Sequence, residues 1–324
     1  MKTRLENKSK RKSIGNEISE YLKLFRKDCE LRGMTHQSIL TYVSAVRIFL
    51  DYLKTRNIQV AEVDTHLLKE YVGHLQSKNL TYKSLGYSFT AISALFELLM
   101  FDGRISSNPV LEVRKRYLKR YKNGEGFKDE KRKLITVKEM KALVRSATTI
   151  RDRAILIVLA KTGVRRGELI RMDIDDVDID ACSIKLKPAA KRSNRLVFFD
   201  KETKNCLLSW LRTRKRLAKP DSQALFISKY ARRVNRNKIY EIVVENAIKA
   251  GLHDPLSDRL EDRFTPHCCR HWFTTHLMRS GMPREHVQEL RGDTRSDAVD
   301  IYYHIDPEDL RKSYLKHIPK LGIV

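Results

Sequence analysis

The stretch Thr162-Gly163-Val164-Arg165-Arg166-Gly167-Glu168-Leu169 decides how the larger part of this chain folds. It follows an unbroken apolar run at residues 154–160, which suits a buried helix and falls far short of the roughly 20 residues that span a bilayer. We expect Gly163 to end that helix and a second, short helix to start from Arg165. Glu168 follows Arg165 by three residues, so it shares a helical face with Arg165 and either orients it or fixes the local packing.

A second arginine occurs far downstream, in His267-Cys268-Cys269-Arg270-His271. His267 and Arg270 are three residues apart on a helix predicted at residues 266–279, so both point to one side. An arginine fork can hold two oxygens at once and stays charged at any relevant pH. Arg165 and Arg270 therefore supply the two cations that phosphoryl transfer without a metal needs around the non-bridging oxygens.

The order of these motifs, with Ile301-Tyr302 near the end, resembles the tyrosine recombinase (phage integrase) family. The resemblance covers nearly the whole chain, and its tail looks most like archaeal, plasmid or viral integrases. It implies a site-specific DNA recombinase that cuts and rejoins duplex DNA through a 3′-phosphotyrosine, for integration, excision or dimer resolution. Because the protein ester conserves the energy of the broken bond, the resemblance implies neither a metal nor any other cofactor.

The resemblance also assigns the remaining catalytic roles. Tyr302 would be the nucleophile in preference to the adjacent Tyr303, and its phenolate has to be favoured by a neighbouring base or by the two arginines because its ordinary pKa is about 10. His267 would be that base or would hold the phosphate. Lys191, on the turn of a predicted strand pair, would protonate the leaving 5′ oxygen, with Lys187 as the alternative general acid.

One position departs from the family pattern. Asp293 stands where the family usually has His or Trp, directly after Leu290-Arg291-Gly292. Because a carboxylate close to a phosphate is repulsive unless it is protonated or paired, we expect Asp293 to bond Arg270, Arg291 or another donor. This departure bears on the efficiency of cleavage more than on its chemistry.

The composition indicates a globular protein with a polyanionic partner. The 324 residues include 65 Lys and Arg against 40 Asp and Glu, which gives a net charge of +25. Five scattered cysteines without a C-x-x-C pair argue against a disulfide framework and a zinc site. The basic N-terminus lacks the apolar core of a secretory signal, and no membrane association is expected, so the sequence predicts a cytoplasmic protein with double-stranded DNA as its partner.

The chain is predicted to be mainly α with a small β-sheet, in two domains. Helical periodicity runs from Asn16 to Arg116, and predicted strands at residues 183–187 and 195–199 lie among helices further on. Another short strand is expected at residues 224–227. The expected parts are a basic N-terminal tail (1–15), a helical core-binding domain (16–116), a basic linker (117–134) and an α+β catalytic domain with a C-terminal helix and tail (135–324).

In the family, two such domains clamp duplex DNA, and four protomers assemble on two sites. By this resemblance the helices at residues 37–53 and 82–100 would face the major groove, and the chain would work as a homotetramer on DNA. The final segment from Asp306 would dock on a neighbouring protomer. The candidate DNA contacts in the first domain are His36, Arg47, Lys83 and Tyr87.

Two other functions stay open from the sequence. A catalytically weak or silent sequence-specific DNA-binding protein would keep the clamp without efficient cleavage, and Asp293 is the feature that favours it. A type IB topoisomerase-like enzyme would use similar chemistry on one strand without sequence choice. The two-domain layout and the Leu-x-Gly motif favour a recombinase over a topoisomerase.

Overall fold

A computed structural model describes residues 2–78, 80–118, 134–188, 195–257, 259–293 and 305–323, with side chains from residue 17 on. The chain divides into two compact units, residues 1–126 and 127–324, and this division falls within the segment predicted as a linker. Each unit has its own apolar core. The two units are described separately below as the helical unit and the catalytic unit.

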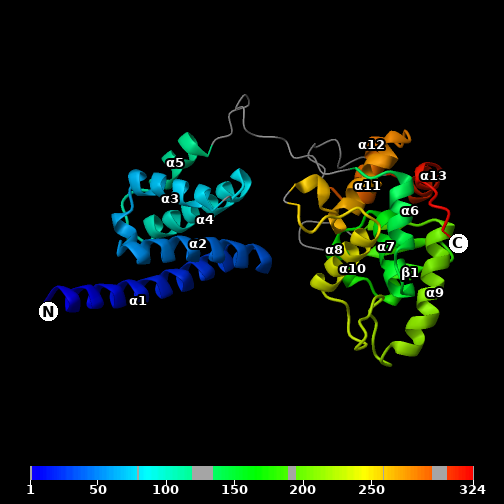
Figure 1. The fold of residues 1–324 in the computed structure, drawn as a ribbon, viewed down its shortest axis with the longest axis horizontal. Helices are drawn as coiled ribbons and strands as arrows, with labels where there is room; N and C mark the ends of the chain where they lie inside the picture. The colour runs from blue at the N-terminus through cyan, green and yellow to red at the C-terminus, as the bar shows by residue number, and fades with distance from the viewer. Residues whose placement is uncertain are drawn as a thin grey trace. The chain divides into compact units, whose positions relative to one another are not determined.

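The helical unit consists of stacked helices, each packed on neighbours through an apolar stripe (Figure 1). Thr35 and Thr81 cap α2 and α4 in the same way, by accepting a hydrogen bond from the backbone N–H three residues on. The core gathers large side chains such as Phe25, Phe49 and Phe89, all fully buried. The elements are α1 (Lys2–Leu31), α2 (His36–Arg56), the 3₁₀ turn η1 (Val60–Glu62), α3 (Thr65–Ser77), α4 (Tyr82–Phe101) and α5 (Val110–Tyr117).

The start of the helical unit differs from the sequence prediction. Helix α1 begins at Lys2, so the region predicted as a tail (1–15) is helical. This stretch contains no proline and is rich in Lys and Arg, which favour helix. Helix α4 is long and apolar enough over its 20 residues to meet a length and composition test for a membrane-spanning helix. Half of that stretch is buried, and α2 and α5 pack against α4, which is the ordinary situation of a core helix.

The catalytic unit is built around α7, in which every residue from Ala154 to Thr162 is buried. Helices α6, α9, α10 and α11 contact it (Figure 1). The helices are α6 (Val137–Arg145), α7 (Ile150–Thr162), α8 (Arg166–Arg171), α9 (Lys201–Leu217), α10 (Arg236–Lys249), α11 (Pro266–Arg279), α12 (Arg284–Arg291) and α13 (Pro307–His317), with 3₁₀ turns η2 (Ile174–Asp176) and η3 (Leu260–Asp262).

A three-stranded antiparallel sheet, in the order β1-β2-β3, completes the catalytic unit. Its strands are β1 (Val177–Asp178), β2 (Ser183–Leu186) and β3 (Arg195–Phe198). The register pairs Ser183 with Phe198 and Leu186 with Arg195, which confirms the predicted strand pair. Strand β1 was not predicted, and the strand expected at 224–227 is present only as two isolated bridges, because no neighbouring strand continues the ladder.

The C-terminal segment packs on its own catalytic unit. Tyr314 of α13 is fully buried and donates a hydrogen bond from its hydroxyl to the Lys161 carbonyl at 2.9 Å. Leu321 and Ile323 are also buried, and their backbone N–H groups bind the Glu202 carboxylate. The docking on a neighbouring protomer that the family resemblance implied would therefore require these contacts to open first.

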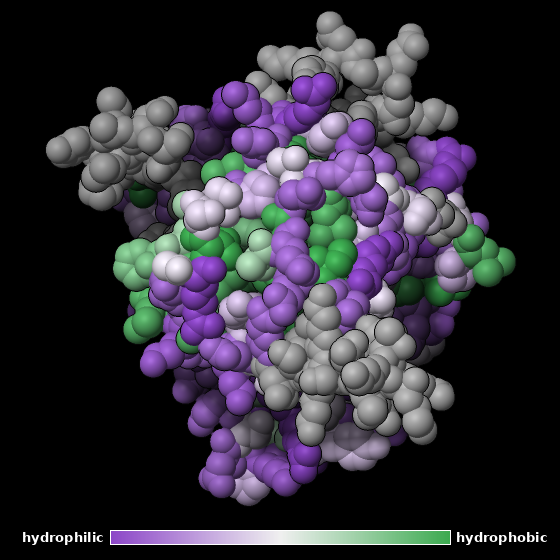
Figure 2. Space-filling view, turned by 90° about the vertical axis from the view of Figure 1, so that its left-hand side faces the viewer, coloured by the Kyte–Doolittle hydropathy of each residue, from purple (hydrophilic) through white to green (hydrophobic). Residues whose placement is uncertain are grey.

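Figure 2 shows one face of the molecule, covered mainly by hydrophilic side chains with smaller hydrophobic areas between them. Isolated exposed apolar side chains are normal on protein surfaces. In the helical unit the most exposed large ones include Leu31 and Phe101, each at a helix end.

Candidate active site

Arg165 lies at the junction of α7 and α8. Gly163 ends α7 in the left-handed conformation, with φ of +60°, and an added Cβ there would lie 2.3 Å from the Phe273 ring. Only glycine fits this position without displacing α11, so the turn that presents Arg165 is fixed by close packing. Arg165 is the N-cap of α8, and its side chain is partly exposed, at 28%.

Arg270 projects from the first turns of α11 and is almost completely buried, at 4% exposure. Its Nη1 donates to the Gly163 carbonyl at 2.8 Å, and its Nη2 donates to the Arg291 carbonyl at 2.8 Å. The carbonyl of Arg291 belongs to the last turn of α12, where carbonyls lack helical partners and the helix dipole is negative. A buried guanidinium is stable here because two such carbonyls face it.

The two predicted arginines converge on the same acceptors. Arg165 Nη1 also donates to the Arg291 carbonyl, at 3.0 Å. Arg165 Nη2 and Arg270 Nη2 each lie 3.3 Å from Oδ1 of Asp293. A single carboxylate oxygen thus bridges two guanidiniums that are 105 residues apart in the sequence (270 − 165).

Asp293 is bound as the sequence predicted, to arginines. Besides the two contacts of Oδ1, its Oδ2 lies 2.8 Å from Nε of Arg291. Gly292 ends α12 with φ of +58°, and this turn places Asp293 directly beyond the helix end. The carboxylate therefore neutralises part of the charge of three arginines.

The pair of arginines forms a site that is short of negative charge. Burial, and then the charges of Arg165 and Arg291, lower the pKa of the Arg270 guanidinium to about 9. Arg270 is still charged at neutral pH, but its charged form is disfavoured by its surroundings despite the nearby carboxylates. An additional anion between the Arg165 and Arg270 guanidiniums would relieve the repulsion between these positive charges. This is the property expected of a phosphate site.

Behind Arg165 lies a buried ion pair between Glu168 of α8 and Arg195 of β3. Glu168 Oε1 and Oε2 accept from Arg195 Nη1 and Nη2 at 3.1 and 3.0 Å, and Oε2 also accepts from the Arg165 backbone N–H at 2.7 Å. Burial opposes ionisation of Glu168, yet the hydrogen bonds from Arg195 and from Arg165 hold its pKa below the ordinary value. The sequence predicted the contact of Glu168 with Arg165 and gave no role to Arg195.

The phage integrase family model matches residues 133–309, which is more than half of the chain and includes both arginines. The chain belongs to the phage integrase family. A second model, the N-terminal SAM-like domain of phage integrases, matches residues 21–102 of the helical unit. The resemblance to tyrosine recombinases is thus confirmed, and with it the enzyme class.

Relatives and solved structures agree with this membership. The chain is 28% identical over 283 residues to tyrosine recombinase XerC of Pelotomaculum thermopropionicum, covering 84% of this chain and 88% of that protein. It is 26% identical to tyrosine recombinase XerD of Staphylococcus epidermidis, covering 94% and 98%. The fold matches the Tn1549 transposon integrase in complex with transposon right end DNA, with a TM-score of 0.66 and 19% identity over 91% of this chain and 98% of that one.

Four other residues were expected to act in this integrase site: His267, Lys187, Lys191 and Tyr302. His267 is exposed on the first turn of α11, three residues before Arg270. Lys187 is bound by Asp173 and by Asp176, and the hydrogen bond to Asp173 raises its pKa above the ordinary value, which is unfavourable for a proton donor. Lys191 and Tyr302 lie outside the described residues.

The four side chains predicted to contact DNA from the helical unit are all exposed. His36 and Arg47 belong to α2, and Lys83 and Tyr87 to α4. Helices α2 and α4 pack against each other and are neighbours in the helical unit. All four side chains are therefore accessible to a partner of the helical unit.

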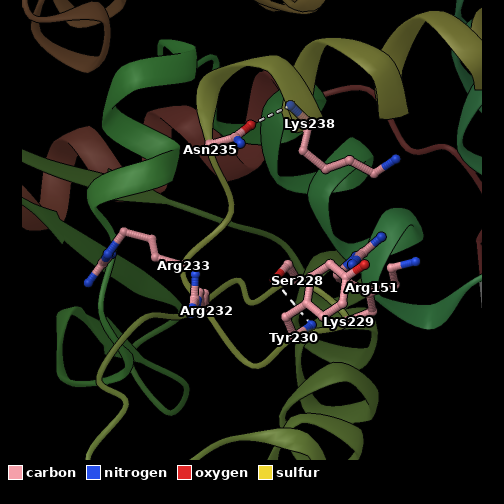
Figure 3. A pocket seen from close by; sticks show the side chains of 8 residues that line it. All are labelled: Arg151, Ser228, Lys229, Tyr230, Arg232, Arg233, Asn235 and Lys238. Carbon is pink, nitrogen blue, oxygen red and sulfur yellow. Dashed lines mark hydrogen bonds between the residues drawn. The ribbon is translucent and has the colours of Figure 1, made fainter.

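A basic cavity of about 500 Å³, which the sequence analysis did not anticipate, lies elsewhere on the catalytic unit (Figure 3). Arg233 in its wall donates to the carbonyls of Ile170 and Met172 at the end of α8, the helix that Arg165 starts. In the sequence, most of the lining residues belong to one basic stretch at residues 229–238. That this stretch lies close to α8 depends on the tertiary fold. The lining residues are Arg151, Ser228, Lys229, Tyr230, Arg232, Arg233, Asn235 and Lys238.

Proposed function

We propose that this chain cleaves and rejoins duplex DNA at a specific site, with Tyr302 as the nucleophile and Arg165 and Arg270 as the phosphate-binding pair. The observation that carries the proposal is the bridging of both guanidiniums by one oxygen of Asp293. A non-bridging oxygen of a phosphate has the charge and size to take the place of that carboxylate oxygen. The proposed roles of the remaining residues follow from the family.

In the proposed reaction the Tyr302 phenolate attacks the scissile phosphorus, and the bond from phosphorus to the 5′ oxygen breaks. The two arginines stabilise the charge that develops on the non-bridging oxygens. Lys191 gives a proton to the leaving 5′ oxygen, and His267 takes the phenol proton or holds the phosphate. Attack by a 5′ hydroxyl on the phosphotyrosine reverses these steps and reseals a strand. No cofactor takes part.

Asp293 has to leave the arginine pair before a phosphate can enter. Its Oδ2 contact with Arg291 gives it a place to remain, since that ion pair does not involve Arg165 or Arg270. The carboxylate then competes with DNA and lowers the rate of cleavage, which is the reason to keep a catalytically weak DNA-binding protein as the second candidate function.

The DNA partner is supported by charge as well as by family. The arginine pair and the basic cavity lie at the two ends of α8, whose six residues extend about 9 Å at 1.5 Å per residue. Phosphates of one duplex can therefore reach both places. We propose that the exposed residues of α2 and α4 supply further contacts, that four protomers assemble on two DNA sites, and that the protein acts in the cytoplasm.

Covalent trapping tests the proposal. Duplexes selected for binding from a random library are nicked close to the protected centre, so that a cleaved strand end diffuses away and the protein remains attached. Wild-type protein and Tyr303→Phe should form the adduct, and Tyr302→Phe should not. An adduct with Tyr302→Phe would refute the assignment of the nucleophile. Binding without any adduct would favour the silent DNA-binding protein, and relaxation of unselected plasmids without strand exchange would favour a topoisomerase.

A further inference from the structure

Arg195 uses all three of its guanidinium nitrogens on the two elements that carry the candidate phosphate site. It is 6% exposed at the start of β3. Nη1 and Nη2 bind the Glu168 carboxylate of α8, and Nε donates to the Leu290 carbonyl of α12 at 3.0 Å. Because the side chain is buried and each of its three nitrogens already binds the protein, we expect Arg195 to affect the reaction through these partners.

The first partner, Glu168, competes with the phosphate for Arg165. Glu168 Oε1 lies 3.4 Å from Arg165 Nη1, and the same oxygen lies 3.1 Å from Arg195 Nη1. Because the carboxylate is only 5% exposed, it needs a cation close by to remain ionised. Arg195 supplies that cation. Without it, Arg165 is the nearest replacement, and its guanidinium would turn from the phosphate site toward Glu168.

The second partner is the end of α12. Gly292 passes so close to Arg195 that an added Cβ would lie 2.5 Å from its Nη1, and its φ of +58° is in the left-handed region. Together with the bond to the Leu290 carbonyl, this contact fixes the turn from which the Arg291 carbonyl and Asp293 face the arginine pair. Arg195 thus supports both sides of the site.

We infer that Arg195 is a positioning residue for DNA cleavage, which holds the Glu168 carboxylate so that the Arg165 guanidinium remains available to the scissile phosphate. The inference rests on the proposed function and adds a residue to it. It differs from a purely structural role in one respect: the harm done by losing Arg195 comes from the charge left on Glu168. Removing that charge should therefore restore activity.

The test is a comparison of Arg195→Met, Glu168→Gln and the double variant in the full-length protein. The rate of phosphotyrosine formation is measured per folded molecule, with the folded fraction determined by thermal melting. Arg195→Met should lower the rate about 100-fold, the scale expected when one phosphate donor is lost. Adding Glu168→Gln should recover at least tenfold of it. Arg195→Lys, which keeps the charge, should lose less than Arg195→Met and supplies a second route if the methionine variant does not fold.

Arg214→Met is the matched control. Arg214 is buried to a similar degree in the same unit, but its guanidinium binds the Ala224 and Ser222 carbonyls away from the arginine pair. It should lower the folded fraction and leave the rate per folded molecule unchanged. Wild-type cleavage by Arg195→Met, or a double variant no faster than Arg195→Met, would overturn the inference.

A binding measurement separates this inference from the proposed function. Inorganic phosphate should raise the melting temperature of wild-type protein and of the double variant more than that of Arg195→Met, because only the last has Arg165 drawn to Glu168. Failure of wild-type protein to form any adduct would count against the proposed function alone. Equal stabilisation of all three proteins by phosphate would count against the role of Arg195, whatever the adduct assay shows.

Discussion

The helical unit and the catalytic unit have similar apolar cores but bury different polar groups. Among the described residues of the helical unit, Ser93 is the single buried polar residue. The catalytic unit buries five charged side chains, each with partners in other elements: Lys161, Glu168, Arg195, Arg214 and Arg270. Burying a charge costs free energy even when it is paired. The buried charges therefore cost the catalytic unit some stability. For the residues around the arginine pair, we attribute this cost to holding a charged substrate in a fixed geometry.

The helical unit follows a simpler principle. Its interior holds the helices together, and the side chains proposed to meet DNA, such as Arg47 and Lys83, are on the outside. Exposed cations contribute affinity through phosphates and can be exchanged with little effect on folding. We accordingly expect substitutions in the catalytic unit to affect folding and chemistry strongly, and surface substitutions in the helical unit to affect DNA affinity alone.

The largest expected effect is on stability, from Lys161→Met. Lys161 is fully buried and binds Asp200 at 2.5 Å, Glu202 at 2.8 Å and the Pro319 carbonyl at 2.6 Å. Removing one partner from such a cluster should lower the free energy of unfolding by about 3–5 kcal/mol. Both tryptophans, Trp210 and Trp272, are in the catalytic unit, so their fluorescence during urea unfolding reports on this unit.

The control for that measurement is Lys201→Met, since Lys201 is exposed on the same helix as Glu202. It should change the unfolding free energy by less than about 0.5 kcal/mol. If Lys161→Met changed the unfolding free energy as little as Lys201→Met does, the ion pairs of Lys161 would not stabilise the catalytic unit. The proposed difference between the two units would then be wrong.

The next effect is on chemistry. Arg270→Lys keeps a positive charge but cannot donate to Gly163, Arg291 and a phosphate with the same planar fork. Phosphotyrosine formation should fall about 100- to 1,000-fold, while affinity for the DNA site changes little. Arg279→Lys, at an exposed position of α11, is the control and should cleave normally. A normal rate for Arg270→Lys would remove Arg270 from the site.

A smaller effect is expected on the pH dependence of stability. The folded pKa of Glu168 is below its unfolded value of about 4.3. Its ionisation therefore stabilises the fold above that pH, and this contribution is lost as the pH falls through the folded pKa. Glu168→Gln should reduce the slope of the unfolding free energy against pH in this acid range. The reduction is at most about 1.4 kcal/mol per pH unit, which corresponds to the uptake of one proton. An unchanged slope would mean that folding does not shift the pKa of Glu168.

The smallest effect concerns the helical unit. Lys83→Ala should weaken DNA binding a few-fold and reduce the slope of log affinity against log salt by about 1, as expected for the loss of one phosphate contact. The tryptophan unfolding curve should not change. Lys27→Ala, at an exposed position of α1, serves as the control with an unchanged salt slope. If both variants behaved alike, the assignment of α4 to the DNA-facing side would be wrong.

Local signals in the sequence predicted much of the fold. The sequence correctly predicted that α7 ends at Gly163, that α8 starts from Arg165 and that α11 covers residues 266–279. It also predicted the strand pair of β2 and β3. Charge logic also predicted that Asp293 binds arginines. The errors occur where local signals are weak: β1 has two residues, the expected strand at 224–227 finds no partner strand, and α1 extends without a distinct start.

The motif Thr162 to Leu169, the second arginine and Ile301-Tyr302 were enough to show the resemblance to tyrosine recombinases, which the family match confirms. What only the tertiary structure decided is how those charges are balanced. Arg195 and Glu168 form their ion pair across 27 residues (195 − 168). Asp293 reaches both arginines only because the C-terminal ends of α7 and α12 lie beside the first turns of α11. Periodicity and propensity describe neighbours along the chain, whereas the availability of Arg165 depends on a contact made through space.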